Sequence, residues 1–175
     1  MIVREATNKD ISKIARVHVD TWQTTYRETF PKEIIENLSY EKREKGWHQV
    51  FENAQKDGNF TYVAENELGQ IVGFANAGIE RSRNLVYRGE LNAIYILKDY
   101  QKKGIGRELV RMVAARFSQM EIYSMLVWVL KDNSASCFYQ KLGGEKVDRK
   151  NIKRGETELI AIAYGWRNTS IINNQ

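Results

Sequence analysis

The 175-residue sequence contains one cysteine, one proline and two histidines. A single cysteine, Cys137, excludes an internal disulfide and any zinc site built from several thiolates. His18 and His48 have no third ligand at helical spacing, so the sequence predicts no metal site. It also contains no internal repeat, low-complexity segment or linker.

Long hydrophobic runs are missing as well. No apolar stretch approaches the roughly 20 residues that cross a bilayer, and the first ten residues, MIVREATNKD, do not resemble a secretory signal. A cytoplasmic location is therefore the default expectation. Hydrophobic residues make up 42% of the chain and charged residues 28%, as in an ordinary soluble globular protein.

The chain has only a small excess of positive over negative charge. Lys and Arg total 27 against 22 Asp and Glu, which gives a net charge of +5. This mildly basic balance suits an anionic ligand. It falls short of the concentrated basic stripe of a nucleic-acid-binding protein, and the basic residues are not interleaved with aromatic ones.

Hydrophobic periodicity and turn residues predict the order of the elements. We expect strands over 2–5, 60–66, 71–79, 89–97, 123–130, 145–149 and 156–166, with helices over 9–22, 31–38, 40–55 and 104–120. A further short helix follows Asn133 and Ser134 and ends near Leu142, before Gly143–Gly144. This order predicts an α/β or α+β domain with a mixed sheet. The length fits one domain, over 1–168, with a flexible tail over 169–175.

Residues 99–117, DYQKKGIGRELVRMVAARF, place two glycines directly before an amphipathic run. A helix start leaves its first N–H groups without intrahelical partners and carries partial positive charge. Glycine lets a phosphate approach such amides closely, and Lys102, Lys103 and Arg107 add charge. The alternative is a tight strand-to-helix turn with solvated lysines, and the loop alone does not decide between the two.

Two common phosphate loops do not fit this stretch. The nucleotide P-loop needs four residues between its glycines, followed by Gly-Lys-Ser/Thr. The dinucleotide fingerprint needs a third glycine at the position of Leu109.

Gln101-Lys102-Lys103-Gly104-Ile105-Gly106 matches the Q/R-x-x-G-x-G/A motif of the GNAT superfamily of acyl-CoA-dependent N-acetyltransferases. The preceding LNAIYILKDY resembles the family's strand before that motif. NSASCFYQKLGGE resembles its N-x-x-A-x-x-F/Y-Y-x-K-x-G-F segment, with Gly144 where an aromatic residue is usual. The resemblance covers roughly residues 2–166. It implies a GNAT-like, mixed, mostly antiparallel central sheet of about six to seven strands flanked by helices.

The resemblance implies how acetyl-CoA would be held as the acyl donor. The pyrophosphate would rest on the amides of the loop, which comprises Gln101, Lys102, Lys103, Gly104, Ile105, Gly106 and Arg107. The pantetheine arm would pair with the backbone of Ile94, Tyr95 and Ile96. Asn133 matches a position that contacts the cofactor arm, with helix capping as the alternative.

The resemblance also implies catalytic roles. Tyr139 matches the tyrosine near the thioester sulfur, where a phenol suits protonation of a departing thiolate. The alternative is an aromatic residue packed on the sheet, although Phe138 is the better core candidate. Glu90 is the candidate base, because it shares a strand face with Ile94 and Ile96. An exposed strand-end charge and a chain of water molecules are the alternatives.

The acceptor pocket of the family is built largely by the segment after the first strand. This segment is rich in aromatic residues, among them Trp22, Tyr26 and Trp47. They form either a wall of the pocket or part of the core. Candidates to contact a polar or charged acceptor are His18, His48, Arg27, Glu28 and Glu33. Cys137 lacks a nearby base in the sequence, so we expect a small buried residue rather than a nucleophile.

The sequence thus predicts an enzyme that moves acetyl from acetyl-CoA to a primary amine in a ternary complex. The acceptor stays open among small amines, amino acids, polyamines, antibiotics and protein amines. A non-catalytic CoA-binding sensor or regulatory module is the alternative. Neither a membrane nor a nucleic-acid partner is expected, and a homodimer is open because dimers are common among GNAT relatives.

Overall fold

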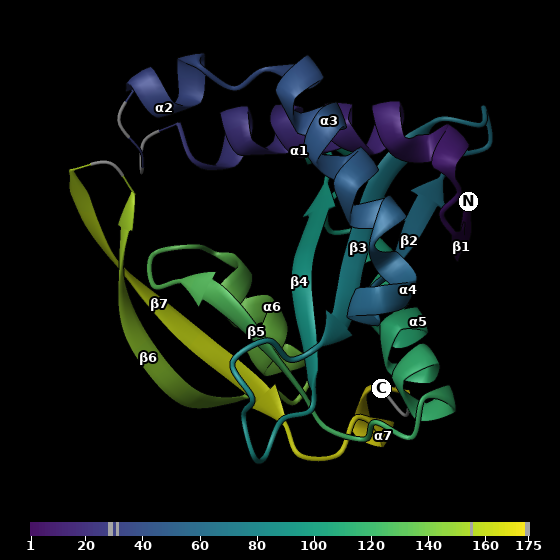
Figure 1. The fold of residues 1–175 in the computed structure, drawn as a ribbon, viewed down its shortest axis with the longest axis vertical. Coiled ribbons are helices and arrows are strands. Elements are labelled where there is room, and N and C mark those ends of the chain that lie inside the picture. Colours follow the sequence, from purple (N-terminus) through teal and green to yellow (C-terminus); the bar gives the residue numbers. More distant parts are fainter. Residues whose placement is uncertain (28–29, 31, 155, 174–175) are drawn as a thin grey trace. The chain divides into compact units, whose positions relative to one another are not determined.

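The computed structural model describes residues 1–27, 30, 32–154 and 156–173. Within them, seven strands form one sheet in the order β1-β2-β3-β4-β5-β7-β6 (Figure 1). The strands are β1 Ile2–Glu5, β2 Phe60–Glu65, β3 Ile71–Ile79, β4 Gly89–Ile96, β5 Met125–Leu130, β6 Glu145–Arg154 and β7 Thr157–Trp166. β4 and β5 are parallel, whereas β1–β2, β5–β7 and β6–β7 pair antiparallel. The expected mixed, mostly antiparallel sheet is confirmed.

The helices lie between these strands in the expected sequence order. They are α1 Ile11–Thr25, α2 Lys32–Glu36, α3 Tyr40–Glu52, α4 Ala54–Asp57, α5 Ile105–Gln119, α6 Ala135–Lys141 and α7 Ser170–Asn173, with short 3-10 turns η1 Asn8–Asp10 and η2 Lys98–Tyr100. No helix in the described part of the chain is long and apolar enough to cross a membrane.

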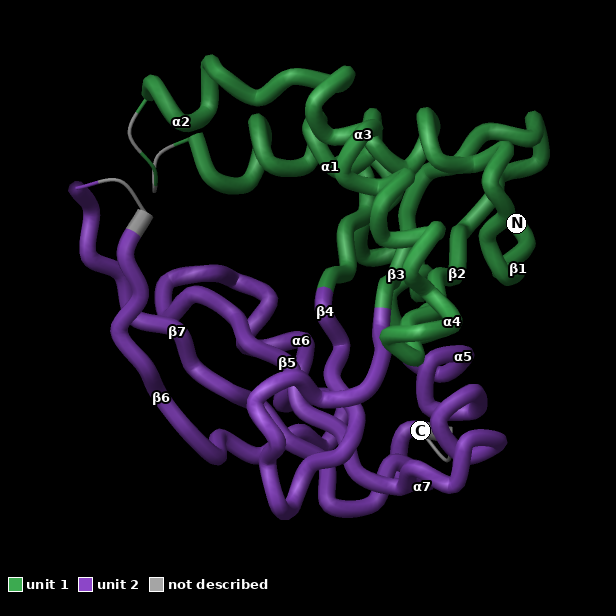
Figure 2. Tube along the Cα trace, in the orientation of Figure 1, with its two compact units in different colours: residues 1–76, 93–109 green, residues 77–92, 110–175 purple. Residues whose placement is uncertain are grey.

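The chain forms two compact units (Figure 2). Unit 1 comprises Met1–Asn76 and Ala93–Leu109, and unit 2 comprises Ala77–Asn92 and Val110–Gln175. Three elements, β3, β4 and α5, continue from one unit into the other.

Unit 1 has its core between helices α1 and α3 and the strands. Ile11 and Ile14 of α1 recur at helical spacing on one face and are at most 2% exposed. They share a hydrophobic cluster with Trp47 of α3, Val63 of β2 and Phe74 of β3. This packing fixes α1 against the strand layer that continues into the candidate site.

In unit 2, β5 is the buried strand expected from its continuous apolar sequence, and it pairs with β7 from Met125↔Trp166 to Leu130↔Ala161. Helix α6 ends at the glycine pair, where Gly143 has a φ of 77°. A Cβ at Gly144 would lie 2.7 Å from the Trp166 ring and 2.9 Å from the Tyr139 carbonyl oxygen. Trp166 therefore occupies space that an aromatic residue at 144 would need.

Two expected boundaries differ from the structure. The helix expected over 40–55 is divided at Asn53, whose side-chain amide donates to the Gln49 carbonyl and competes with the helical ladder. Residues 150–154, expected in a turn, extend β6 opposite Thr157–Ala161. Residues 150–153 contain one apolar residue, Ile152, so no alternating pattern predicts a strand there. Pro31, expected in the first turn of the second helix, lies outside the described residues.

The segment predicted as a flexible tail, 169–175, is described as far as residue 173. The Thr169 amide donates to the Tyr123 carbonyl at 2.8 Å, and α7 follows at Ser170. Ile172 is 1% exposed, so its burial holds this segment against unit 2 as far as residue 173.

Candidate active site

The glycine loop begins after η2 and leads into α5. Two of its residues, Lys102 at φ 59° and Gly104 at φ 84°, have left-handed backbone angles. In the part of the chain that the structure describes, the N–H groups of Lys102 to Gly106 make no hydrogen bond. The loop thus offers a series of backbone donors at the start of a 15-residue helix.

Space and anchoring suit the approach of a ligand to these donors. No heavy atom lies within 4 Å of the position that a Cβ on Gly104 would take. Ile105 is 3% exposed and anchors the first helical turn. Gln101 Nε2 donates to the Ile96 carbonyl at 2.9 Å and ties the loop to the end of β4.

Positive charge accompanies the donors. Lys102, Lys103 and Arg107 are exposed, and Lys103 Nζ lies 5.4 Å from the Tyr100 ring centroid. The partial positive charge of the α5 N-terminus has the same sign. Free amides, an open glycine and three cations together fit a diphosphate group.

Strand β4 is the second part of the candidate donor-binding site, after the glycine loop. Its parallel ladder with β5 joins Gly89–Leu91 to Met125–Val127. Ile94 and Ile96 lie beyond that ladder and are partly buried. Their position agrees with the backbone edge that the resemblance implies for a pantetheine arm.

The other face of β4 carries a polar network that the sequence did not reveal. The Tyr95 ring stacks on His18 with centroids 4.7 Å apart, and its hydroxyl accepts a hydrogen bond of 2.9 Å from Trp22 Nε1. Trp47 Nε1 donates to His18 Nδ1 at 3.2 Å. The alternation of side chains along β4 placed Tyr95 on this face, but nothing in the sequence indicated its partners.

Burial sets the protonation state of His18. Desolvation, with a smaller contribution from the positive charge of Arg43, lowers the pKa of His18 to about 3. The ring is therefore neutral at pH 7. Because Nδ1 accepts from Trp47, the proton is on Nε2.

The three aromatic residues expected in the acceptor pocket occupy different surroundings. Trp47 is 5% exposed and packs in the core. Trp22 and Tyr26 are half-buried and contact each other at 5.0 Å between ring centroids. Near them, α1 and α2 border a cavity of about 630 Å³ lined by Gln23, Arg27, Lys32, Ile35 and Glu36.

The remaining polar candidates for the acceptor contacts are dispersed. His48 and Glu33 are exposed, and Glu28 lies outside the described residues. Arg27 is the candidate that lines the cavity beside α2.

Glu90 is buried in unit 2, not exposed at a strand end. Its carboxylate accepts two hydrogen bonds from Arg81, 2.7 Å from NH2 and 3.1 Å from Nε. The ion pair raises the pKa of Arg81.

The residues of α6 depart from two expectations. Tyr139 is 4% exposed and lies near the rings of Tyr164 and Trp166, whereas Phe138 is partly exposed. The expectation that Phe138 is the better core residue was wrong, because the helix turns position 139 toward β7. Cys137 is exposed, so its expected burial was also wrong.

Asn133 caps the start of α6. Its Oδ1 accepts from the Ala135 N–H at 2.8 Å, and its carbonyl accepts from the Ser136 N–H. Counted back from Tyr139 with strict motif spacing, the motif's asparagine falls at Asp132. Both observations favour the capping interpretation of Asn133.

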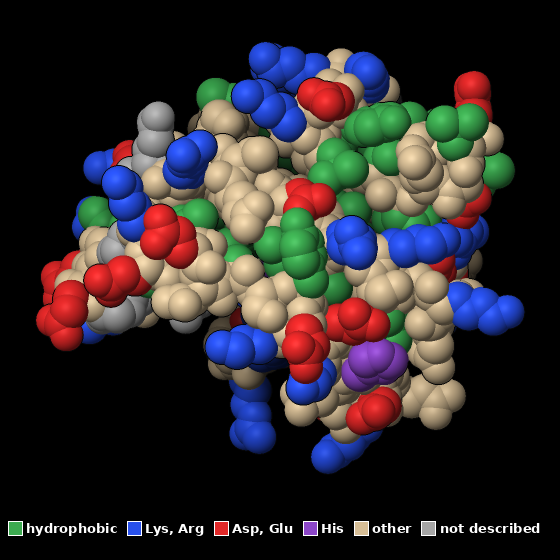
Figure 3. Space-filling view, turned by 90° about the horizontal axis from the view of Figure 1, so that it is seen from above, with side chains coloured by type: hydrophobic (Ala, Val, Ile, Leu, Met, Phe, Trp, Pro, Cys, Tyr) green, Lys and Arg blue, Asp and Glu red, His purple; other side chains and the backbone are tan. Residues whose placement is uncertain are grey.

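Charges of both signs share the surface of α1 and α3. Figure 3 shows Lys and Arg interspersed with Asp and Glu on this face, and Lys45 Nζ pairs with Glu41 at 2.9 Å. Among the described residues, no group of three or more His, Cys, Asp or Glu is placed to hold a metal ion.

Two comparisons of the sequence with known proteins found matches. A model of the acetyltransferase (GNAT) domain matches residues 57–143. The chain is 37% identical over 170 residues to the uncharacterized N-acetyltransferase YuaI of Bacillus subtilis. The aligned region covers 97% of this chain and 95% of YuaI.

Two solved structures share the fold. The PaiA N-acetyltransferase of Thermoplasma acidophilum, in complex with coenzyme A, has a TM-score of 0.72 at 22% identity and covers 92% of this chain and 96% of its own. YncA of Salmonella typhimurium, with its cofactor acetyl-CoA, has a TM-score of 0.70 at 18% identity. The matched region covers 94% of this chain and 92% of YncA.

Proposed function

Because the chain belongs to the GNAT acetyltransferase family, we propose that it transfers the acetyl group of acetyl-CoA to a primary amine by direct attack of the amine. The observation that carries the proposal is the glycine loop, with amides unbonded from Lys102 to Gly106 and open space above Gly104. Such a start of a long helix binds phosphate oxygens in many proteins.

Binding of the donor uses main-chain groups more than side chains. The loop N–H groups donate hydrogen bonds to the pyrophosphate oxygens, and Lys102, Lys103 and Arg107 supply complementary charge. The backbone of Ile94–Ile96 pairs with the amide groups of the pantetheine arm. Since main-chain contacts dominate, the side chains of Ile94 and Ile96 remain free to pack as ordinary strand residues.

Tyr139 acts as the general acid in this proposal. When the amine attacks the acetyl carbonyl, the carbon–sulfur bond breaks and the thiolate of CoA takes the phenolic proton. Ordinary phenol and thiol pKa values, about 10 and 8.5, are close enough for efficient transfer. Support comes from the position of Tyr139 in the F-Y-x-K-x-G segment.

Water takes the proton that the acceptor's ammonium group must lose before its nitrogen can attack. Two hydrogen bonds from Arg81 occupy both carboxylate oxygens of Glu90, so this carboxylate is engaged in an ion pair. A chain of water molecules carries this proton away.

A thiol-release assay tests this function directly. Wild-type protein and acetyl-CoA are supplied with a small alkylamine, an amino acid, a polyamine and a peptide amine in turn. With the best acceptor, Tyr139→Phe should lower kcat by about 100-fold or more and leave KM for acetyl-CoA unchanged. Tyr164→Phe, which removes a neighbouring hydroxyl, is the matched control and should keep its kcat.

Two outcomes would contradict parts of the proposal. Equal kcat in Tyr139→Phe and Tyr164→Phe would remove Tyr139 as the acid. If acetyl-CoA binds but no amine causes release of the CoA thiol, the protein would be a CoA-binding sensor rather than an enzyme.

A further inference from the structure

The end of β4 that the proposed function assigns to the pantetheine arm lies beyond the ladder with β5. That ladder joins Gly89–Leu91 to Met125–Val127, and Ile94–Ile96 follow it along the strand. On the side of β3, the Leu97 N–H donates to the Val72 carbonyl at 2.9 Å. A segment with fewer ladder contacts opens locally at lower cost, so its side-chain contacts decide how well it keeps its position.

Tyr95, in the middle of this segment, has its side chain held by α1. The Trp22 Nε1–H donates to the Tyr95 hydroxyl at 2.9 Å, and the Tyr95 ring stacks on His18 with centroids 4.7 Å apart. Trp22 and His18 are four residues apart and therefore share one face of the helix. One helix thus holds both the tip and the face of the Tyr95 ring.

His18 is itself fixed in the core of unit 1. Trp47 Nε1 donates to His18 Nδ1 at 3.2 Å, and the Trp47 ring packs edge-on against Phe74 with centroids 5.0 Å apart. His18 is 8% exposed and Trp47 is 5% exposed. The neutral His18 ring accepts this hydrogen bond and stacks on Tyr95 at the same time, so α1 holds Tyr95 through side chains that are themselves held in place.

We propose that Trp22 and His18 are positioning residues for the acyl donor, which act through Tyr95 and not by contact with the donor. The inference rests on the proposed function, in which the backbone of Ile94–Ile96 pairs with the pantetheine arm. We call Trp22, His18 and Tyr95 the Tyr95 anchor. The anchor favours the position of the strand end in which its N–H and C=O groups meet the arm. Without it, donor affinity falls in proportion to the fraction of molecules that stay aligned.

Two variants break the hydrogen bond of the anchor and keep an aromatic ring, Trp22→Phe and Tyr95→Phe. Each should raise the Kd of acetyl-CoA, measured by calorimetry, about 5-fold, which corresponds to one neutral hydrogen bond. Because both variants break the same bond, the double variant should bind about as weakly as the weaker single variant. Unchanged affinity in both single variants, or fully additive losses in the double variant, would overturn the proposal.

The two halves of the donor distinguish the anchor from the glycine loop. S-acetylpantetheine carries the pantetheine arm alone, and adenosine 3′-phosphate 5′-diphosphate carries the phosphates. In NMR titrations, Trp22→Phe and Tyr95→Phe should lose affinity for S-acetylpantetheine and bind the nucleotide like the wild type. An equal loss for both halves would indicate general damage to the fold and would overturn the positioning role.

Amide hydrogen exchange of the free protein tests the anchor without a ligand. The Leu97 N–H should exchange about 5-fold faster in Trp22→Phe and Tyr95→Phe than in the wild type. Faster exchange with unchanged acetyl-CoA affinity would overturn the link to donor binding and leave the proposed function standing. If the wild type bound no acetyl-CoA, the proposed function would fail, and the inference with it.

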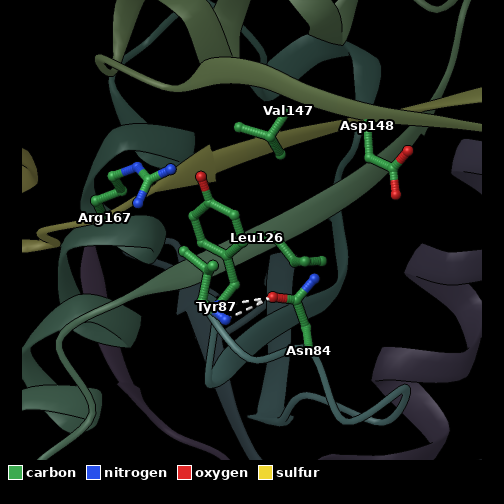
Figure 4. A pocket seen from close by; sticks show the side chains of 7 residues that line it. Asn84, Tyr87, Leu126, Val147, Asp148 and Arg167 are labelled. Carbon is green, nitrogen blue, oxygen red and sulfur yellow. Dashed lines mark hydrogen bonds between the residues drawn. The ribbon is translucent and has the colours of Figure 1, made fainter.

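Two tyrosines offer matched controls. The Tyr40 hydroxyl donates to Asp20 Oδ1 of α1 at 2.6 Å, so Tyr40→Phe removes a contact to α1 that does not involve β4. Tyr87 is 5% exposed and lines a cavity of about 380 Å³ between residues 84–87 and β6 (Figure 4), so Tyr87→Phe removes a buried hydroxyl in unit 2. Both should match the wild type in acetyl-CoA affinity and in Leu97 exchange. A loss in either control as large as in Trp22→Phe would overturn the specific role of the Tyr95 anchor.

Discussion

His18 is buried among aromatic rings, and its neutral state links stability to pH. The folded pKa is about 3, against 6.5 for the free side chain. As pH falls below 6.5, the unfolded chain binds a proton that the folded chain does not. Stability is therefore fully present above that pH and declines as the solution becomes more acidic.

We expect the free energy of unfolding to fall by about 2 kcal/mol between pH 7 and pH 5 because of His18, at about 1.4 kcal/mol per pH unit below 6.5. Denaturant unfolding at the two pH values measures this difference. His18→Gln should lose most of it. His48→Gln, which removes the exposed histidine, should keep it, and an equal pH dependence in both variants would contradict the assignment.

Single residues also explain a departure from the family motif. Gly144 stands where an aromatic residue is usual, and Trp166 of β7 fills the adjacent space. Trp166 is 1% exposed, and its Nε1 donates to the Leu142 carbonyl at 2.7 Å. The aromatic side chain is thus supplied from another strand, so the departure leaves the end of α6 packed.

At the scale of elements, the proposed donor binding depends on the start of α5. Gly104 has a φ of 84°, where a β-branched residue is strained. In Gly104→Val the backbone should move out of this conformation, which would misalign the amides proposed to hold the pyrophosphate. We expect the dissociation constant for acetyl-CoA, measured by calorimetry, to rise at least 10-fold, with binding of free pantetheine unchanged.

Gly58 offers a matched control for this element. It ends α4 with a left-handed φ of 63°, so Gly58→Val introduces similar backbone strain away from the glycine loop. Its affinity for acetyl-CoA should match that of the wild type. If Gly104→Val and Gly58→Val bind acetyl-CoA with equal affinity, the glycine loop is only a strand-to-helix turn and not a binding site.

At the scale of the whole molecule, the two compact units share β3, β4 and α5 as continuous elements. Unfolding one unit would therefore break helices and strands that also belong to the other. We expect the single domain predicted over 1–168 to unfold in one cooperative transition. Circular dichroism and tryptophan fluorescence should give the same midpoint, since Trp22 and Trp47 report on unit 1 and Trp128 and Trp166 on unit 2. Two separated transitions would show independent domains.

The sequence by itself determined the features that depend on neighbouring residues. The glycine pair before an amphipathic run predicted the start of α5, and alternating or continuous apolar runs predicted β2, β3 and β5. These signals are local, because backbone angles and side-chain periodicity are set within a few residues. The break between α3 and α4 at Asn53 was not predicted. The helical pattern of the sequence continues through this position, and the contact of the Asn53 side chain with the Gln49 carbonyl leaves no signal in it.

Only the tertiary structure decided the features that join distant segments. The pairing of Glu90 with Arg81, the burial of Tyr139 against β7 and the stacking of Tyr95 on His18 depend on how strands and helices pack. The cavity between residues 84–87 and β6 has the same origin. Such contacts leave no periodic signal in the sequence, because each partner alone is compatible with an exposed or a core position.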